Sequence, residues 1–131
     1  MNAPEGTSLA DDETLARFVL KKDWIRKIDN TVKPDAFIPP RDLQLSVTRQ
    51  VGISTEKLVE IGKSVASQTG LQFFGRADIE TRQVLKNALR AVAWPLADNA
   101  NHAHLIGWPA DKALQKTIAL DLAAVAVFVP A

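Results

Sequence analysis

The sequence predicts a single α+β domain, in which a small, mostly antiparallel sheet packs against two or three helices. Three observations support this prediction. Residues 43–49 alternate apolar and polar side chains, which is the pattern of a half-buried strand. Residues 54–69 repeat apolar side chains at helical spacing, between a capping serine and Gly70. The length of 131 residues suits one domain, and such a domain can bury a core without a metal or a disulfide.

The other elements of the first half are predicted in order along the chain. Residues 1–12 are polar and acidic, which predicts a flexible N-terminal tail and leaves 13–131 as the domain. A helix is expected over about 12–28, because apolar residues recur there at spacings of three, four and seven. The three prolines of 30–42 predict an ordered loop that leads into the strand at 43–49.

The second half of the chain predicts two or three further strands and a final helix. A strand is expected at 71–79. Residues 80–90 do not decide between helix and strand, and we favour a short helix or helical turn that leads into a strand at 90–96. Another strand is expected at 102–108, and a last helix at about 110–127 should pack against the sheet or a partner. The apolar stripe of this helix consists of Leu114, Ile118, Leu122 and Val125.

The composition argues against several classes of protein. Sixteen Lys and Arg against fifteen Asp and Glu give a net charge of +1, without the basic excess of a nucleic-acid-binding or membrane-surface protein. Cysteine is absent, which excludes disulfides, zinc–thiolate sites and cysteine nucleophiles. The longest nearly apolar run, "TIALDLAAVAVFVPA", is shorter than the roughly 18–20 residues that cross a bilayer, and the first residues do not resemble a signal peptide. We therefore expect a cytoplasmic protein that contacts no membrane and no nucleic acid.

Both histidines of the chain lie in the block "DNANHAHLIGW", which is the first candidate for a functional surface. On a strand, His102 and His104 point to the same face. Two imidazoles in that arrangement can bind a metal or act together as acid and base. A metal would need a third ligand, for which Asp98, Asp111 and Asp35 are candidates. The His-x-His spacing alone is a weak signal, so we favour a structural or exposed pair and predict no metal or cofactor.

Arginines at the ends of the predicted strands are the second candidate. Arg49 and Arg76 could clamp a carboxylate or a phosphate with two parallel hydrogen bonds, or pair with local acids such as Asp42 and Asp78. Asn101 could orient a ligand through its amide, or close its own turn by bonding the backbone, which we favour. The chain carries no phosphate loop, nucleophile elbow, zinc-protease helix or dinucleotide fingerprint.

Three stretches occur in the order "VKPDAFIPPRDLQLSVTR", "FFGRADI" and "NANHAHLIGWPADK". They resemble recurrent blocks of a family of small bacterial proteins for which no activity is known. In those blocks an Ala-Phe step precedes a Leu-Ser-Val strand that ends near Arg, and an Asn-x-x-His-Ala block follows. The resemblance covers about residues 15–128 and carries over no function. It groups seven positions into one candidate functional surface: Asp35, Ser46, Arg49, Arg76, Asn101, His102 and His104.

Two classes of function stay open. We favour a non-catalytic binding or accessory protein of the bacterial cytoplasm, which binds another protein through a surface around residues 98–108. A homodimer through the C-terminal helix is a second contact that the sequence allows. The alternative is a small enzyme for an anionic or phosphorylated substrate, with His102 or His104 as acid/base and Arg49 or Arg76 as the anion clamp. That alternative requires these four side chains to converge in one pocket.

Overall fold

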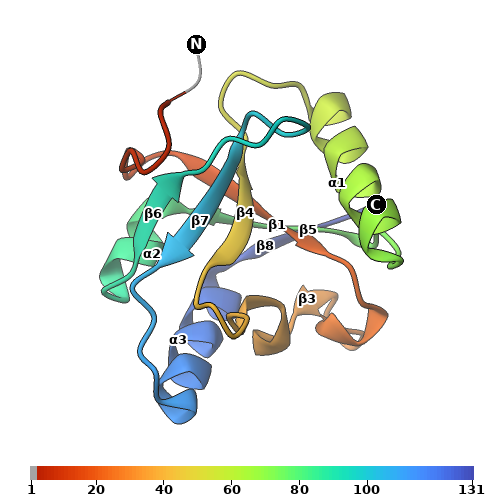
Figure 1. Ribbon diagram of the computed structural model, residues 1–131. Coiled ribbons are helices and arrows are strands. Elements are labelled where there is room, and N and C mark those ends of the chain that lie inside the picture. The colour runs from red at the N-terminus through yellow and green to blue at the C-terminus, as the bar shows by residue number, and fades with distance from the viewer. Residues whose placement is uncertain (1–2) are drawn as a thin grey trace.

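A six-stranded antiparallel sheet forms the centre of the computed structural model, which describes residues 3–131 (Figure 1). The strand order is β6-β7-β4-β1-β5-β8, so β4 and β1 lie in the middle and β6 and β8 at the edges. The strands are β1 (Thr14–Val19), β4 (Leu45–Arg49), β5 (Gly75–Glu80), β6 (Arg90–Ala93), β7 (His102–Ile106) and β8 (Val127–Pro130). A separate short hairpin pairs β2 (Ile25–Arg26) with β3 (Thr31–Val32).

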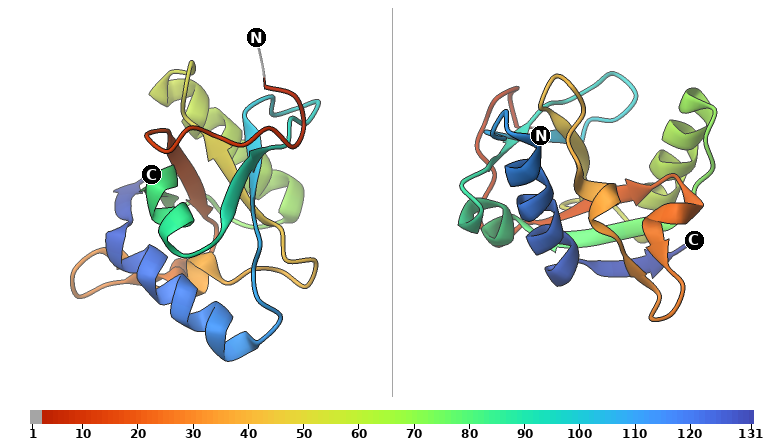
Figure 2. Two further views of the ribbon diagram at one scale, coloured as in Figure 1. Left: turned by 90° about the vertical axis from the view of Figure 1, so that its left-hand side faces the viewer. Right: turned by 90° about the horizontal axis from the view of Figure 1, so that it is seen from below.

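Helices cover both faces of this sheet. They are α1 (Thr55–Thr69), α2 (Thr81–Lys86) and α3 (Lys112–Val125), and two 3-10 turns are η1 (Lys22–Trp24) and η2 (Pro34–Phe37). Figure 1 shows α1 and α3 on opposite sides of β1, β5 and β8, and Figure 2 shows the same arrangement from two further directions. No helix within residues 3–131 is long and apolar enough to span a membrane. The predicted α+β class with a mostly antiparallel sheet is therefore confirmed.

Strand alternation divides the core into two parts. The larger part includes Leu15 and Val47 and packs against η2 and α3. The smaller part joins Ala16 and Phe18 of β1 to one side of α1. Because neighbouring residues of β1 enter different cores, this strand is buried on both faces.

The predicted helix over 12–28 is wrong, since its first part forms the strand β1. A strand that is covered on both faces reads as a continuous apolar run, so the period of two is lost from its sequence. The chain then continues through η1 into the β2–β3 hairpin.

The segment predicted as a flexible tail is hydrogen-bonded along the outer edge of β6. The amide of Gly6 donates to the carbonyl of Ala93 (2.7 Å), and the amide of Leu9 donates to the carbonyl of Ala91 (3.0 Å). The side chain of Leu9 is buried in the larger core. These bonds protect an edge strand that would otherwise expose its backbone groups.

The helix predicted over 54–69 is confirmed together with both of its ends. The hydroxyl of Ser54 accepts a hydrogen bond from the amide of Lys57 (3.0 Å), as an N-cap does. Gly70 ends the helix in the left-handed conformation, with φ of 70°. Residues 80–90 contain α2 and a turn before β6, which agrees with the interpretation that we favoured.

The C-terminal helix is shorter than predicted and is turned about its axis. It ends at Val125, and the β-branched and aromatic residues after it form β8 on the edge of β5. The buried side consists of Gln115, Ala119, Leu122 and Ala123. Of the predicted stripe, Leu122 is buried and Ile118 is partly buried against the larger core, whereas Leu114 and Val125 are exposed. The small alanines allow the helix to approach η2 closely.

We expect the Leu105→Ala substitution in β7 to lower the free energy of unfolding by about 2–5 kcal/mol, because this fully buried side chain leaves a cavity. The matched change Leu114→Ala removes the same atoms from a side chain that is 55% exposed. It should change the stability by no more than about 0.5 kcal/mol. Urea unfolding followed by circular dichroism measures both, and equal losses would contradict the assigned core.

Candidate functional site

A groove lies between α1 and the part of the sheet that contains β4 and β7. Its cavity volume is about 230 Å³. Ser46 and Thr48 of β4 and His102 of β7 line one side. Side chains of α1, including Ser64 and Gln68, line the other. The groove is therefore on the face of the sheet that carries both histidines.

His102 presents a hydrogen-bond acceptor to this groove. Its Nδ1 lies 2.9 Å from the carbonyl oxygen of Trp94. A carbonyl oxygen can only accept, so Nδ1 must carry the proton, and in the neutral ring Nε2 is left with a lone pair. Burial lowers the pKa of His102, although the bond to Trp94 and the charge of Asp98 act in the opposite direction. The imidazole is therefore neutral at pH 7.

His104 packs behind His102 instead of lining the groove. Its ring lies 4.8 Å from that of His102 and 5.1 Å from that of Trp94, measured between centroids. It is only 8% exposed, and its Nδ1 is buried without a hydrogen-bond partner among residues 3–131. Burial lowers the pKa of His104, the neighbouring His102 lowers it further, and Asp42 raises it. His104 therefore serves to pack and orient His102.

The floor of the groove is formed where β1 and β4 separate. Their pairing ends at Ala16 and Thr48. The alternation of the antiparallel ladder makes Phe18 and Ser46 the next pair that would exchange hydrogen bonds, but the strands no longer pair there. Both residues line the groove instead. Figure 1 shows that β1 and β4 run in different directions across the sheet.

Arg17 fills the gap between the separated strands. Its Nε donates to the carbonyl of Ala36 (2.7 Å), and its Nη1 donates to the carbonyl of Ser46 (3.1 Å). The guanidinium also lies over the ring of Trp24, 5.4 Å from its centroid.

By strand alternation Arg17 leaves β1 on the face of Leu15 and Val19, opposite to the histidines, and it reaches the groove through the gap. A cation is therefore present at the floor. The sequence prediction missed it because it expected a helix over 12–28, whereas recognition of the strand would have placed Arg17 in the sheet.

The loop between β6 and β7 is held over the groove by polar contacts. The amide of Asn99 donates to the hydroxyl of Thr48 (3.0 Å), and both residues are buried. Asp98 accepts a hydrogen bond from Gln68 of α1 (3.0 Å). These contacts connect the loop to both walls, so the groove is a defined part of the fold.

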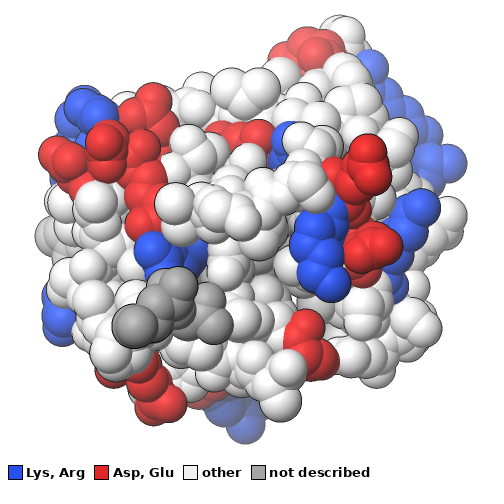
Figure 3. All heavy atoms as spheres, turned by 90° about the horizontal axis from the view of Figure 1, so that it is seen from above, with Lys and Arg blue, Asp and Glu red and all other residues white. Residues whose placement is uncertain are grey.

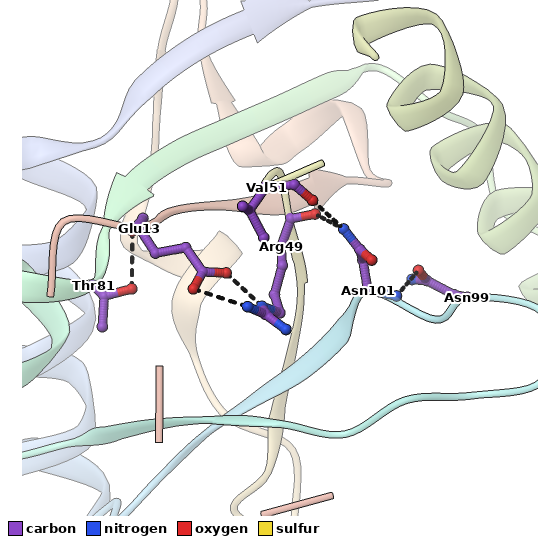
Figure 4. Close-up of polar contacts among 6 residues, drawn as sticks. All are labelled: Glu13, Arg49, Val51, Thr81, Asn99 and Asn101. Atoms are coloured by element: carbon purple, nitrogen blue, oxygen red, sulfur yellow. Dashed lines mark hydrogen bonds and ion pairs between the residues drawn. The ribbon is translucent and has the colours of Figure 1, made fainter. Parts of the chain in front are cut away.

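Two predicted site residues, Arg49 and Asn101, have structural roles (Figure 4). The guanidinium of Arg49 forms a two-bonded ion pair with Glu13. Arg49 is the register partner of Leu15, so it lies on the face of the sheet opposite to the histidines.

The amide of Asn101 donates to the carbonyls of Arg49 (3.0 Å) and Val51 (2.9 Å). It ties the loop before β7 to the residues at the end of β4, so the prediction that Asn101 bonds its own backbone is wrong. Asn99 closes that turn instead, since its Oδ1 accepts from the backbone N–H of Asn101 (3.1 Å).

Arg76 and Asp35 also lie outside the groove. Arg76 shares the face of the histidines, but its strand β5 is three places from β7 in the sheet, and α1 packs over the strands between them. It pairs with Asp78 (3.0 Å), which Gln50 also contacts. Asp35 is exposed in η2.

Of the seven predicted positions, the groove therefore brings together Ser46 and His102, with His104 behind them. The enzyme alternative required both arginines to converge with the histidines, and neither Arg49 nor Arg76 lines the groove. Within the described residues, no three His, Asp or Glu side chains lie close enough together to hold a metal ion. Comparisons with known protein families, with curated proteins and with solved structures find no match for this chain.

We expect His102 to be in the Nδ1-protonated tautomer and both histidines to titrate below the ordinary value of about 6.5. Since the unfolded chain then binds these protons first, the free energy of unfolding should decrease as the pH falls from 7.5 through about 6.5. Imidazole ¹⁵N NMR shows the tautomer and the midpoints, and urea unfolding from about pH 7.5 to 5.5 shows the loss of stability. A midpoint above 6.5 for His102 would contradict this assignment.

Proposed function

We propose that this chain is a non-catalytic binding protein that holds a small polar molecule in the groove between α1 and strands β4 and β7. The observation that carries the proposal is the interrupted ladder between β1 and β4. Backbone groups within a sheet are normally paired. This interruption leaves the backbone groups of Phe18 and the N–H of Ser46 available to something else, since among the described residues only the carbonyl of Ser46 has a partner, Arg17. Phe18 and Ser46 line a hollow that already contains Arg17 and His102.

The size of the groove supports a small ligand. Its volume of about 230 Å³ lies just below the range of roughly 300–1,000 Å³ that is typical of ligand pockets. The proposal keeps the binding surface around residues 98–108 that the sequence favours, and it replaces a protein partner by a small molecule. The absence of cysteine supports a reducing compartment, so the bacterial cytoplasm is the location that we propose.

The surroundings of His102 support binding over catalysis. The partner of its Nδ1 is a carbonyl, which orients the ring without supplying the negative charge that would stabilise an imidazolium. No hydrogen bond joins this ring to a hydroxyl group of residues 3–131. The geometry therefore provides an oriented acceptor, without an activated nucleophile beside it.

Surface charge supports the same conclusion. Acidic and basic side chains are interspersed on the face shown in Figure 3, without one continuous field of positive charge. A polyanion such as nucleic acid is held mainly by such a field. A ligand of the groove is recognised by a few placed groups instead.

A screen of small polar compounds by ¹⁵N–¹H NMR tests the proposal, with two matched variants of α1. Ser64 lines the groove and Ser67 does not, although both are exposed on the same helix. We expect hits to shift the resonances of Ser46, Thr48 and His102. Ser64→Phe should fill the groove and weaken binding at least tenfold, whereas Ser67→Phe should leave it within twofold. Hits that map elsewhere, or that both variants weaken equally, would refute the proposal.

A further inference from the structure

We infer that the ligand of this groove carries an oxyanion, a carboxylate or a phosphate, and that Arg17 binds it where β1 and β4 separate. The inference rests on the proposed function, because it names the chemistry of the ligand in the same groove. It is carried by the unmatched charge and the unused donors of Arg17.

The hydrogen bonds of Arg17 leave much of its capacity free. A guanidinium has five N–H donors. Two of them reach the carbonyls of Ala36 and Ser46, and within residues 3–131 no acceptor is found for the other three. A planar oxyanion can take two such donors at once.

In the described part of the chain, Arg17 lacks the carboxylate partner that the other two half-buried arginines have. Arg49 is paired with Glu13, and Arg76 is paired with Asp78. Among the described residues no carboxylate lies within ion-pair distance of Arg17. The fold therefore neutralises two of these three cations and leaves unpaired the one that lines a groove.

Burial makes this unpaired cation costly for the free protein. Desolvation lowers the pKa of Arg17 to about 10, so the group is still protonated at pH 7. The ring of Trp24 offsets a part of the cost through its electron-rich face. An anion bound at Arg17 would provide the missing charge.

The surroundings of Arg17 complement an organic anion. In the alternation of the ladder, the backbone N–H of Ser46 points toward β1 and is a further donor at the gap. Two residues further along β4, Thr48 is the register partner of His102, whose Nε2 is an acceptor. A small organic anion with a hydroxyl or amino group satisfies both ends of this arrangement.

The test is an NMR titration of the protein with sodium acetate, with inorganic phosphate and with acetamide, at constant ionic strength. Acetamide has the shape of acetate without its charge. We expect saturable shifts of the Arg17 Nε–Hε signal and of the Ser46 amide with at least one anion, and none with acetamide. The anion that binds with the lower dissociation constant identifies the ligand as a carboxylate or a phosphate.

Two variants localise the effect. Arg17→Met should weaken anion binding at least tenfold. Lys21→Met is the matched control, because Lys21 lies over the same Trp24 ring, at 5.8 Å, but is exposed and does not line the groove; binding should stay within twofold. If Arg17→Met does not fold, the Arg17 Nε–Hε titration of the unmodified protein decides.

Several results would overturn the inference. The first is the absence of saturable shifts with either anion, and the second is equal shifts with acetamide. The third is that Lys21→Met weakens anion binding as much as Arg17→Met does, which would indicate attraction by general surface charge. If neutral compounds bind in the groove and are lost in Ser64→Phe while both anions fail to bind, this inference is wrong and the proposed function stands. If neither kind of compound binds, both are wrong.

Discussion

The early separation of β1 from β4 is the constraint on which the rest of the structure depends. On its other side, β1 pairs with β5 along its full length, from Thr14 to Val19. On the β4 side, pairing stops at Ala16, and η2 packs beside β1 on the face of the larger core. The carbonyls at the gap need donors, and Arg17 supplies them to Ala36 and Ser46. A side chain therefore closes the sheet where a ladder would normally do so. Because a side chain takes the place of the ladder, unpaired backbone groups, a cation and a hollow lie together at this gap.

Buried charge is handled in two ways in this fold. Arg49 and Glu13 satisfy each other, and the backbone carbonyl of Glu13 also accepts from the hydroxyl of Thr81, which joins the start of β1 to α2 (Figure 4). Arg76 pairs with Asp78, whose pKa is nevertheless raised because burial outweighs the help from its neighbours. Breaking such a pair leaves the second charge uncompensated, so these two arginines have a structural role. Arg17 has carbonyl partners only, and therefore its charge is available to a molecule from outside.

The local part of this fold could be predicted from the sequence, and the long-range part could not. The strand at 43–49 and the helix at 54–69 have patterns and caps that lie within a few residues of each other. By contrast β1 is covered on both faces, so its alternation is hidden. The same distinction applies to the site. His102 and Ser46 could be proposed because alternation alone sets their faces. The role of Arg17 depends on partners 19 and 29 residues away and on a ladder that ends early, which no local pattern records.

The two sides of the groove differ in polarity, and this difference gives a bound molecule one preferred direction. Near Ser46, the guanidinium of Arg17 offers donors and positive charge. Near Thr48, the neutral ring of His102 offers an acceptor, with Asp98 in the loop above it. The contact between the two histidines reinforces this polarity, because a proton on one ring disfavours a proton on the other. Burial keeps His102 neutral, so it does not compete with Arg17 for negative charge. A ligand with a single anionic group then gains most when that group lies at the gap between β1 and β4 and its hydrogen-bond donor faces His102.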